Sequence, residues 1–489
     1  MGSNRHYFKR GISYLKRNGV KKSFYKACER LVRDRQESSY ERHVCTEDEL
    51  AAQREYSFAH SYKISILVPL YGTEPGLLRK TLDSVGEQTY ANWELILADA
   101  SPDDQRRNTV RDFIEDLSAK CREDRFGSVF DKVRYIKLDE NKGISGNTNE
   151  ALAHSSGDYV ALLDHDDLLE PDALYEVMSA IEKAEKSFLS HDSISRIMAA
   201  YTDEDKVSED GKDYFDPHFK PDFDPVLLTT NNYICHLFVA DANLAKSVGG
   251  FRSDYDGAQD HDFILRCTEG LSRAQILHVP KVLYHWRSTR GSTSENPDAK
   301  LYAYEAGRRA VEDYLKRAGI DAKVTDSEHL GFFRIEYEKL HRSVTSLSAQ
   351  TFSEMEKMNV TMPQQEFVMI LADSLKPLDP TYIEDMMSCM RLSNVGAVTG
   401  KIVKSGAKIE SAGYDVLDDK TLKPRFEGLS RFFSGYMHRA DLDQTVGGFS
   451  PDCVLVRTIA VDKWFPRIEL KDGFDTYYMP KAVFKRISK

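Results

Sequence analysis

The sequence predicts an α/β fold built around a largely parallel sheet, and three observations support this. Short apolar runs typical of buried strands alternate with longer amphipathic runs typical of helices. The segments between strands are long enough for the helical crossovers that parallel strands require. Polar residues directly follow several of the strand-like runs, as they do at the ligand-binding edge of a parallel sheet.

The first two thirds of the chain supply this alternation. We expect strands at residues 63–69, 93–98, 133–138, 159–163 and 279–286, and helices at residues 77–85, 108–120, 147–154 and 173–184. This order predicts parallel strands with helices on both faces of the sheet. Residues 36–60 are polar and charged, and we expect them to form a linker.

Composition indicates an ordered, multidomain protein. The chain has 489 residues, of which 41% are hydrophobic and 11% aromatic, enough for two or three domains with their own cores. Its seven cysteines include no Cys-x-x-Cys pair, so the spacing indicates neither a zinc site nor a disulfide framework, and it fits a reducing cytoplasm. We find no apolar run long enough for a membrane span and no signal peptide.

Charge is unevenly distributed along the chain. Residues 1–35 carry a net charge of +9, whereas the whole chain carries −11. Apolar residues recur in this arm at three- and four-residue steps, which is typical of a basic amphipathic helix. Such a helix either lies on an anionic membrane surface or packs on the protein with its basic face in water. Nucleic acid is not an expected partner, because the body of the chain is acidic.

A cluster of acidic residues follows the apolar run at residues 159–163. Asp164, Asp166 and Asp167 are close together there, and ionised carboxylates repel one another unless a cation lies between them. Mg²⁺ or Mn²⁺ bound to the phosphates of a substrate fits this place, because these ions prefer oxygen ligands. The alternative is a solvated turn.

Other polar features fall at the same predicted edge. Tyr71 follows one strand and could stack on a nucleobase, and Asp99 follows the next and could accept from a base or ribose. The glycines of residues 141–146 would let a helix N-terminus approach a negatively charged ligand. Together these features describe a pocket for a nucleotide diphosphate.

Two residues further along the chain have both structural and functional interpretations. Asp260 is expected at or just before a helix start, where a carboxylate serves either as a cap or as a general base. His285 is expected at the end of a strand, where it would be a third metal ligand beside Asp166 or an ordinary structural histidine.

Several motifs occur in a fixed order between residues 63 and about 320. They are Ile66-Leu-Val-Pro-Leu-Tyr71, Ser84-Val-Gly-Glu-Gln-Thr89, Asn141-Lys-Gly143 with Asn149, Leu163-Asp-His-Asp-Asp167, Gly249-Gly-Phe251 and Gln259-Asp260. In these motifs the chain resembles the inverting nucleotide-sugar glycosyltransferases of family 2, which have the Rossmann-like GT-A fold. It looks most like bacterial enzymes that build cell-surface polysaccharides such as rhamnan or capsule.

The resemblance implies a transferase that uses Mn²⁺ or Mg²⁺ and a nucleotide-sugar donor, either a UDP-sugar or dTDP-rhamnose. It implies a saccharide or lipid-linked saccharide acceptor, bound near residues 203–206, 231–232 and His236. The catalytic base would be Asp260, although Gln259 stands where the family has a glutamate. The implied metal ligands are Asp166, Asp164 and His285. The implied donor-binding residues are Pro69, Tyr71, Asp99, Gly143, Asn149 and Asp164.

The last third of the chain resembles the middle of the same fold. We therefore expect a catalytic domain at residues 61–330 and a degenerate, non-catalytic second copy at residues 331–489, which would bind acceptor, dimerise or position the enzyme. Gly447-Gly-Phe449 repeats an earlier motif, but Ala372-Asp373-Ser374 stands where the carboxylate cluster would recur. The alternative is an unrelated α/β domain.

The sequence leaves two main functions to compare. One is a transferase in the cytoplasm, or at the cytoplasmic face of the plasma membrane through residues 1–35. The other is a non-catalytic carbohydrate-binding or scaffold protein on the same fold, because a fold alone does not establish activity. A nucleotide-sugar hydrolase is disfavoured, because no second acid stands beside Asp260.

Overall fold

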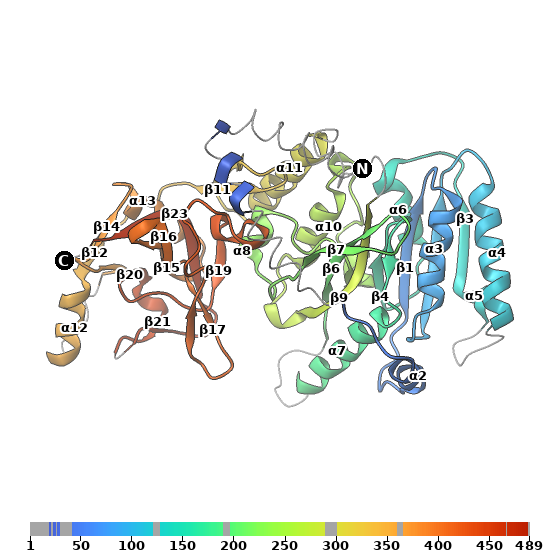
Figure 1. Ribbon diagram of the computed structural model, residues 1–489, viewed down its shortest axis with the longest axis horizontal. Helices are drawn as coiled ribbons and strands as arrows, with labels where there is room; N and C mark the ends of the chain where they lie inside the picture. The colour runs from blue at the N-terminus through green and yellow to red at the C-terminus, as the bar shows by residue number, and fades with distance from the viewer. Residues whose placement is uncertain are drawn as a thin grey trace. The chain divides into compact units, whose positions relative to one another are not determined.

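The computed structural model describes residues 19–20, 23–25, 27–29, 42–120, 128–188, 196–288, 301–358, 365–465 and 467–487. The chain divides into two compact units (Figure 1). The N-terminal unit comprises Gln36–Phe223 and Asn232–Tyr314. The C-terminal unit comprises Leu315–Lys489 together with Met1–Arg35 and Asp224–Asn231.

The N-terminal unit is built on one mixed sheet in the order β3-β2-β1-β4-β8-β6-β9-β5, with β7 paired to β6. Strands β3, β2, β1 and β4 are parallel, as the sequence predicts, whereas β8 is antiparallel to both of its neighbours. The strands are β1 (Ile64–Leu70), β2 (Trp93–Asp99), β3 (Val133–Lys137), β4 (Tyr159–Leu162), β5 (Leu168–Leu169), β6 (Ala199–Ser208), β7 (Tyr214–His218), β8 (Phe238–Asp241) and β9 (Ile276–Ser288).

Helices connect these strands, and a continuous apolar core fills the space between helices and sheet. They are α3 (Pro75–Gly86), α4 (Gln105–Lys120), α5 (Val129–Lys132), α6 (Gly143–Ala153), α7 (Ala173–Phe188), α9 (Ala242–Ser247), α10 (Gln259–Thr268) and α11 (Leu301–Arg317). The predicted strands and helices are confirmed, most of them to within a few residues. Helix α6 begins at Gly143 rather than at residue 147, so most of the expected glycine loop is its first turn.

The expected linker contains a helix that the sequence analysis missed. Helix α2 (Glu47–Glu55) begins with a capping box, in which the Thr46 side chain accepts from the Glu49 backbone and the Glu49 side chain accepts from the Thr46 backbone. The pattern Thr-x-x-Glu is a recognised start signal for helices, so the sequence contained the information needed to find it.

The C-terminal unit repeats the strand pairing of the N-terminal unit. Its main sheet has the order β12-β13-β20-β15-β23-β14, with β16 paired to β15. The successive pairs are parallel, antiparallel, antiparallel, parallel and antiparallel, and the pairs along β1-β4-β8-β6-β9-β5 have the same sequence of directions. The strands are β12 (Val344–Ser348), β13 (Phe367–Leu371), β14 (Leu375–Pro377), β15 (Val395–Lys404), β16 (Lys408–Ser411), β20 (Cys453–Arg457) and β23 (Asp475–Arg486).

The matching strand directions support a resemblance of the C-terminal unit to the N-terminal unit, but the resemblance covers only part of the sheet. Helix α13 (Tyr382–Cys389) joins β14 to β15, as α7 joins β5 to β6. In the described part of the unit's main sheet, β12 is an edge strand, so nothing there matches β2 and β3. The predicted equivalence of Gly447-Gly-Phe449 with Gly249-Gly-Phe251 is wrong, because the former precedes β20 whereas the latter follows β8.

The limits of the units differ from the expected boundary at residue 330. Contacts divide the chain at Tyr314, because β10 (Ala322–Asp326) and β11 (Phe333–Tyr337) pair with each other as part of the C-terminal unit. Helix α8 (Pro225–Thr230) also belongs to that unit, where its N-cap Asp224 accepts from the Thr445 backbone.

Most of the basic arm lies outside the described residues. In its described part, the Tyr25 ring stacks on Phe432 of the same unit at 4.7 Å, and the Glu29 carboxylate accepts from the Gly435 backbone at 2.6 Å. These contacts favour an arm that packs on the protein, and membrane binding by residues 1–35 stays a prediction. A search of the helices in the described segments finds none with the length and apolar character needed to cross a bilayer.

Candidate active site

The carboxyl ends of β1, β2 and β4 lie side by side at one edge of the sheet. The parallel registers align Leu70 with Asp99 and Leu67 with Leu162, so the residues that follow each strand emerge at the same edge. Tyr71 follows β1 with 56% of its surface exposed, and Asp164 follows β4. The prediction that polar features of separate strands gather at one edge is confirmed for these strands.

The three acids of the cluster have different surroundings. Asp167 is buried, and its carboxylate accepts from the Tyr284 hydroxyl at 2.5 Å and from the Arg287 backbone at 2.7 Å. Asp164 and Asp166 are more open, with 47% and 25% of their side chains exposed. Asp167 therefore fixes the turn, whereas Asp164 and Asp166 are available to a ligand.

Two of these carboxyl groups resist ionisation. Burial raises the pKa of Asp167 well above its usual range, and Asp164 and Asp166 raise it further. The pKa of Asp164 is also raised, first because the surrounding protein displaces water and then because Asp166 and Asp260 repel its charge. A cation among these groups would remove the repulsion, so the site fits a divalent metal ion.

Among the described residues, two histidines lie beside this cluster: His165, whose Nδ1 is 3.7 Å from Asp166 Oδ1, and His236. The ring of His236 stacks on Tyr284 at 4.6 Å, and its Nε2 lies 3.9 Å from Asp164 Oδ2. Candidate ligand atoms of Asp164, Asp167 and His236 all lie within 4.8 Å of one another. Burial opposes a charge on the ring, but Cys235 and Glu204 outweigh it and raise the pKa of His236 well above its ordinary value. His236 is thus a neighbour of Asp164 whose protonated form is favoured.

The structure does not place His285 beside Asp166, contrary to the expectation for a third metal ligand. His285 is buried, with Nδ1 2.5 Å from Asp205 Oδ1 and Nε2 3.1 Å from Glu170 Oε1. Its neighbour Tyr284 contacts Asp167, and adjacent residues of a strand point to opposite faces of a sheet. Both ring nitrogens of His285 therefore serve a buried ion-pair network on the other face.

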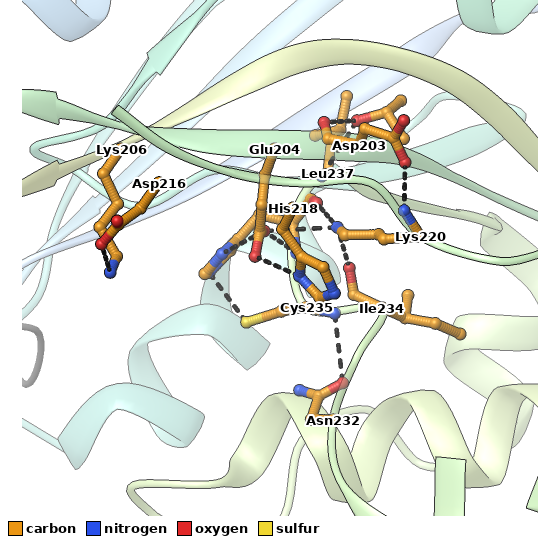
Figure 2. Close-up of polar contacts among 12 residues, drawn as sticks. Asp203, Glu204, Lys206, Asp216, His218, Lys220, Asn232, Ile234, Cys235 and Leu237 are labelled. Carbon is orange, nitrogen blue, oxygen red and sulfur yellow. Dashed lines mark hydrogen bonds and ion pairs between the residues drawn. The ribbon is translucent and has the colours of Figure 1, made fainter. Parts of the chain in front are cut away.

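A buried polar network surrounds Glu204, near His218 and Lys220 (Figure 2). Glu204 lies 3.3 Å from Lys220 Nζ, 3.4 Å from His218 Nδ1 and 3.3 Å from His236 Nδ1. Burial opposes the charge on Glu204, but Lys220, His218 and His236 outweigh it and hold the pKa of Glu204 well below its usual range. Of the expected acceptor segment 203–206, Glu204 thus supports His236 rather than facing a ligand directly.

Asp260 lies on the same side as Asp164 and is not a helix cap. It is the second residue of α10, and the N-cap residue Ala258 makes no side-chain cap hydrogen bond. The Asn232 amide donates to Asp260 Oδ2 at 2.8 Å, and the Cys235 thiol lies 3.4 Å from the same oxygen. Among the described residues, Oδ1 of Asp260 receives no hydrogen bond. One oxygen is thus held in place, and the other is available to a substrate.

Asp99, the last residue of β2, is buried, and both of its carboxylate oxygens accept hydrogen bonds from the protein. Its Oδ1 accepts from the Ser101 backbone at 2.8 Å, and its Oδ2 accepts from the Tyr135 hydroxyl at 2.5 Å. Ser101 Oγ in turn accepts from the Gly72 backbone at 2.9 Å, directly after Tyr71. Asp99 therefore holds the loop that presents Tyr71. Pro69 lies within β1, where it pairs with Ala98. Contact of these residues with a nucleobase stays a prediction.

Gly143 and Asn149 serve the fold in ways that the sequence did not indicate. Gly143 has a positive φ, and a Cβ there would lie 2.7 Å from Asp256 Oδ2. Asp256 also accepts from the Ser145 hydroxyl at 2.5 Å, so a carboxylate of the protein already occupies the start of α6. Asn149 donates to the Phe251 carbonyl and accepts from the Phe251 backbone, both at 2.8 Å. None of these contacts involves Asp164.

Arg287 is a residue of the site that sequence reasoning missed. It is fully buried, and none of its three side-chain nitrogens has a hydrogen-bond partner among the described residues. Burial lowers the pKa of its guanidinium, and Asp167 and Asp166 oppose this most strongly, which places the group near the carboxylate cluster. The available signal was a basic residue near the end of the strand that carries His285.

Comparison with known proteins agrees with this geometry. Residues 65–226 match the model of glycosyl transferase family 2. An uncharacterized protein of Sinorhizobium fredii, y4gI, is 44% identical over 255 residues, covering 52% of this chain and 25% of its own. The O-antigen biosynthesis protein RfbC of Myxococcus xanthus is 28% identical over 410 residues, covering 72% and 30%. The chain therefore spans less than a third of the length of these two relatives.

Solved structures with some likeness include TarS residues 1–349 of S. aureus in complex with UDP-GlcNAc. It has 18% identity and a TM-score of 0.37, covering 52% of this chain and 66% of its own. The mannosyltransferase PcManGT of Pyrobaculum calidifontis, in complex with GDP-Man and Mn²⁺, has 17% identity and a TM-score of 0.33, covering 55% and 81%. The family model includes β1, β2 and β4 and the three acids that follow β4. The chain therefore contains a glycosyl transferase family 2 domain, with the GT-A type of α/β fold that its motifs predict.

Proposed function

We propose that the chain is an inverting glycosyltransferase that moves a sugar from a nucleotide-diphosphate donor to a saccharide or lipid-linked saccharide in bacterial surface polysaccharide synthesis. The observation that carries the proposal is the arrangement of Asp260. Asn232 holds one of its carboxylate oxygens, and the other receives no hydrogen bond from the described residues. A carboxylate fixed in this way suits a general base.

The proposed reaction follows from these positions. Asp260 takes the proton from an acceptor hydroxyl as that oxygen attacks the anomeric carbon from the face opposite the diphosphate. The configuration of the transferred sugar therefore inverts. Asp164 and Asp166 would hold a divalent metal, which when bound offsets negative charge on the departing diphosphate. The buried guanidinium of Arg287, two residues after His285 on β9, interacts electrostatically with Asp167 and Asp166 and offsets part of their negative charge.

Replacement of the base separates catalysis from binding. Asp260→Asn keeps the size of the side chain but removes the basic oxygen, so transfer is expected to fall by about 10²-fold or more, whereas donor affinity is retained. Turnover of radiolabelled donor sugar and donor binding by calorimetry measure the two effects. Near-normal turnover would refute the role of Asp260.

Loss of the metal has its own test. Activity is expected to disappear in excess chelator and to return with Mn²⁺ or Mg²⁺, because Asp164 and Asp166 would otherwise repel the donor diphosphate. Full activity in chelator would refute a metal at these acids. Donor binding with no transfer to any acceptor would favour a carbohydrate-binding or scaffold protein.

The names of similar proteins suggest candidate donors and acceptors. One similar Escherichia coli protein, 30% identical over 128 residues, is named as a glucosyltransferase that acts from UDP-Glc on a diphosphoundecaprenol-linked GlcNAc. It covers 26% of this chain and 44% of its own. We therefore propose UDP-sugars and dTDP-rhamnose as the first donors to screen. Stabilisation of the chain against heat by each donor with Mn²⁺ identifies the donor.

A further inference from the structure

Three side chains that commonly bind metals meet at the start of α7, away from the active site. His43 and Cys45 come from the segment that precedes α2, and Asp172 immediately precedes α7. His43 Nε2 lies 2.8 Å from Asp172 Oδ2, Cys45 Sγ lies 3.0 Å from the same oxygen, and the nitrogen and sulfur are 3.6 Å apart. Sequence spacing gives no sign of this cluster, because Cys45 and Asp172 are 127 positions apart.

This cluster is separate from the carboxylates that follow β4. The adjoining Arg42 contacts Glu170 at 3.1 Å, and Glu170 contacts His285 at 3.1 Å. His285 points to the face of β9 opposite Tyr284, which contacts Asp167. The segment that carries His43 and Cys45 is therefore linked to the other side of the sheet from Asp164. A metal bound there would not share ligands with the donor site.

The chemistry and spacing of the three groups suit zinc. Imidazole nitrogen, thiolate sulfur and carboxylate oxygen are the ligands that Zn²⁺ takes in proteins. Bond lengths of about 2.0 Å to nitrogen or oxygen and about 2.3 Å to sulfur place ligand atoms of a tetrahedral site about 3.3 to 3.6 Å apart. His43 and Cys45 already have this separation, and Asp172 Oδ2 would need to move by about half an ångström.

The surroundings could complete such a site. The Gln53 amide lies 3.7 Å from Cys45 Sγ, where its N–H can donate to a thiolate. Asp172 is buried, whereas 27% of the His43 side chain is exposed, so solvent can reach the cluster and supply a fourth ligand. The geometry alone also fits a trio held by hydrogen bonds, with the thiol and imidazole donating to Asp172.

We propose that His43, Cys45 and Asp172 form a structural site for a zinc-class divalent cation, which fastens the segment before α2 to the start of α7. Binding would release the thiol proton of Cys45 to solvent and leave the thiolate on the metal. The proposal does not depend on glycosyl transfer, because none of the three residues takes part in the proposed reaction.

Cobalt provides a direct test, because a thiolate bound to Co²⁺ gives a near-ultraviolet charge-transfer band that oxygen ligands do not give. The full chain, freed of metal with chelator, is titrated with Co²⁺ and followed by absorption. We expect one equivalent to produce the thiolate band and Zn²⁺ to displace it. Cys45→Ser should abolish the band. Asp172→Asn and His43→Gln, which keep the thiol, should each weaken Co²⁺ binding by about tenfold or more.

Cys235→Ser is the matched control, because Cys235 is the thiol that lies near His236 and Glu204 at the active site. The band should persist in that variant. A band absent from the unmodified chain, retained in Cys45→Ser or lost only in Cys235→Ser would overturn the proposal and leave a hydrogen-bonded trio. Circular dichroism checks the folding of each variant, and Asp172→Asn and His43→Gln decide the matter if Cys45→Ser fails to fold.

Discussion

At the scale of single residues, two buried arginines differ in how the protein compensates their charge. Arg266 and Arg287 are both buried arginines of the N-terminal unit. The guanidinium of Arg266 donates to Asp262 and to the carbonyls of Val248 and Gly250. The guanidinium of Arg287 has no hydrogen-bond partner among the described residues. A buried charge without a partner is costly, so this guanidinium is expected to destabilise the fold.

Removing that charge is expected to stabilise the chain in the absence of donor. Arg287→Met replaces a desolvated cation by an apolar side chain of similar length, and the free energy of unfolding should rise by about 1–3 kcal/mol. Donor affinity should fall by about tenfold or more, because the diphosphate loses a positive charge. Chemical denaturation and donor titration measure these opposite effects.

Arg266→Met is the control for that experiment. It removes one of the two arginine partners of the buried Asp262, which keeps Arg252, and it leaves the carbonyls of Val248 and Gly250 without this donor. It should therefore lower the free energy of unfolding by about 2–3 kcal/mol. An equal loss of stability in both variants would show that Arg287 is paired in solution.

At the scale of elements, hydrogen bonds between segments distant in sequence hold the edge of the sheet together. Asn149 of α6 makes both of its amide contacts with the Phe251 backbone, and this brings Gly250 against its side chain. On β2, Glu94 accepts from Lys63 and Ser65 of the neighbouring strand region and from Ser156 before β4. The Asn149 contacts join α6 to the segment after α9, and the Glu94 contacts join β1, β2 and β4 at the ends of these strands opposite Tyr71 and Asp164.

Two adjacent glycines provide a matched test of the Asn149 contact. A Cβ on Gly250 would lie 2.4 Å from Asn149 Oδ1, whereas a Cβ on Gly249 meets nothing within 4 Å, and both residues have positive φ. Gly249→Ala should cost about 1 kcal/mol of unfolding free energy for backbone strain. Gly250→Ala should cost about 2 kcal/mol more, because it also disrupts a buried hydrogen-bonded pair. Equal costs in urea denaturation would contradict the packing of Asn149 on Gly250.

The Glu94 contacts predict a pH-dependent stability. Burial alone would raise the pKa of Glu94, but hydrogen bonds from Lys63, Ser65 and Ser156 outweigh it and lower the pKa to about 2. A lowered pKa stabilises the fold above the ordinary glutamate pKa, and this stabilisation is lost as pH falls towards 2. Glu94→Gln should therefore cost about 2 kcal/mol at pH 7, allowing for solvent screening, and progressively less below pH 4.

Denaturation of this variant and the unmodified chain at pH 7 and pH 3 measures the difference. Glu150→Gln is the control, because the Glu150–Lys142 ion pair is exposed and should have little effect at either pH. A Glu94→Gln deficit of equal size at both pH values would show that the charge of Glu94 is not what stabilises these contacts.

Some site residues could be predicted from the sequence and others could not, because only some of their positions depend on local patterns. Strands, helices and the shared edge follow from periodicity and order, so Tyr71, Asp164 and Asp166 were placed correctly at strand ends. The face of the sheet to which a side chain points depends on the register between strands. The prediction from sequence was wrong on this point for one residue. His285 was expected at the metal, but it lies one residue out of phase with Tyr284 and faces Asp205 and Glu170. His236, which was expected near the acceptor, lies 3.9 Å from Asp164 instead.

At the scale of the whole molecule, two units share one sequence of strand pairings but only one carries the carboxylates. Asp164 follows β4, and Asp373 lies in the equivalent connection between β13 and β14. Asp373 is flanked by Ala372 and Ser374, so no second acid is adjacent. We therefore propose that the C-terminal unit is non-catalytic, and that the donor binds only in the N-terminal unit.

Equivalent substitutions in the two units test this proposal. Asp166→Asn should abolish Mn²⁺-dependent transfer, because it removes a carboxylate proposed to hold the metal, whereas Asp373→Asn should leave turnover unchanged. Radiolabelled sugar transfer at saturating Mn²⁺ measures both. A large loss of turnover in Asp373→Asn would show that the C-terminal unit contributes to catalysis.

In the described part of the C-terminal sheet, the missing counterparts of β2 and β3 have a consequence for any attempt to build a donor site there. In the N-terminal unit, β2 ends at Asp99 and β3 carries Tyr135, which holds it, so these strands build the wall behind Tyr71. Acids placed at residues 372–374 would supply ligands for a cation but no such wall. Point substitution alone is therefore not expected to create a donor site in this unit, which would also need a strand–helix–strand segment equivalent to β2 and β3.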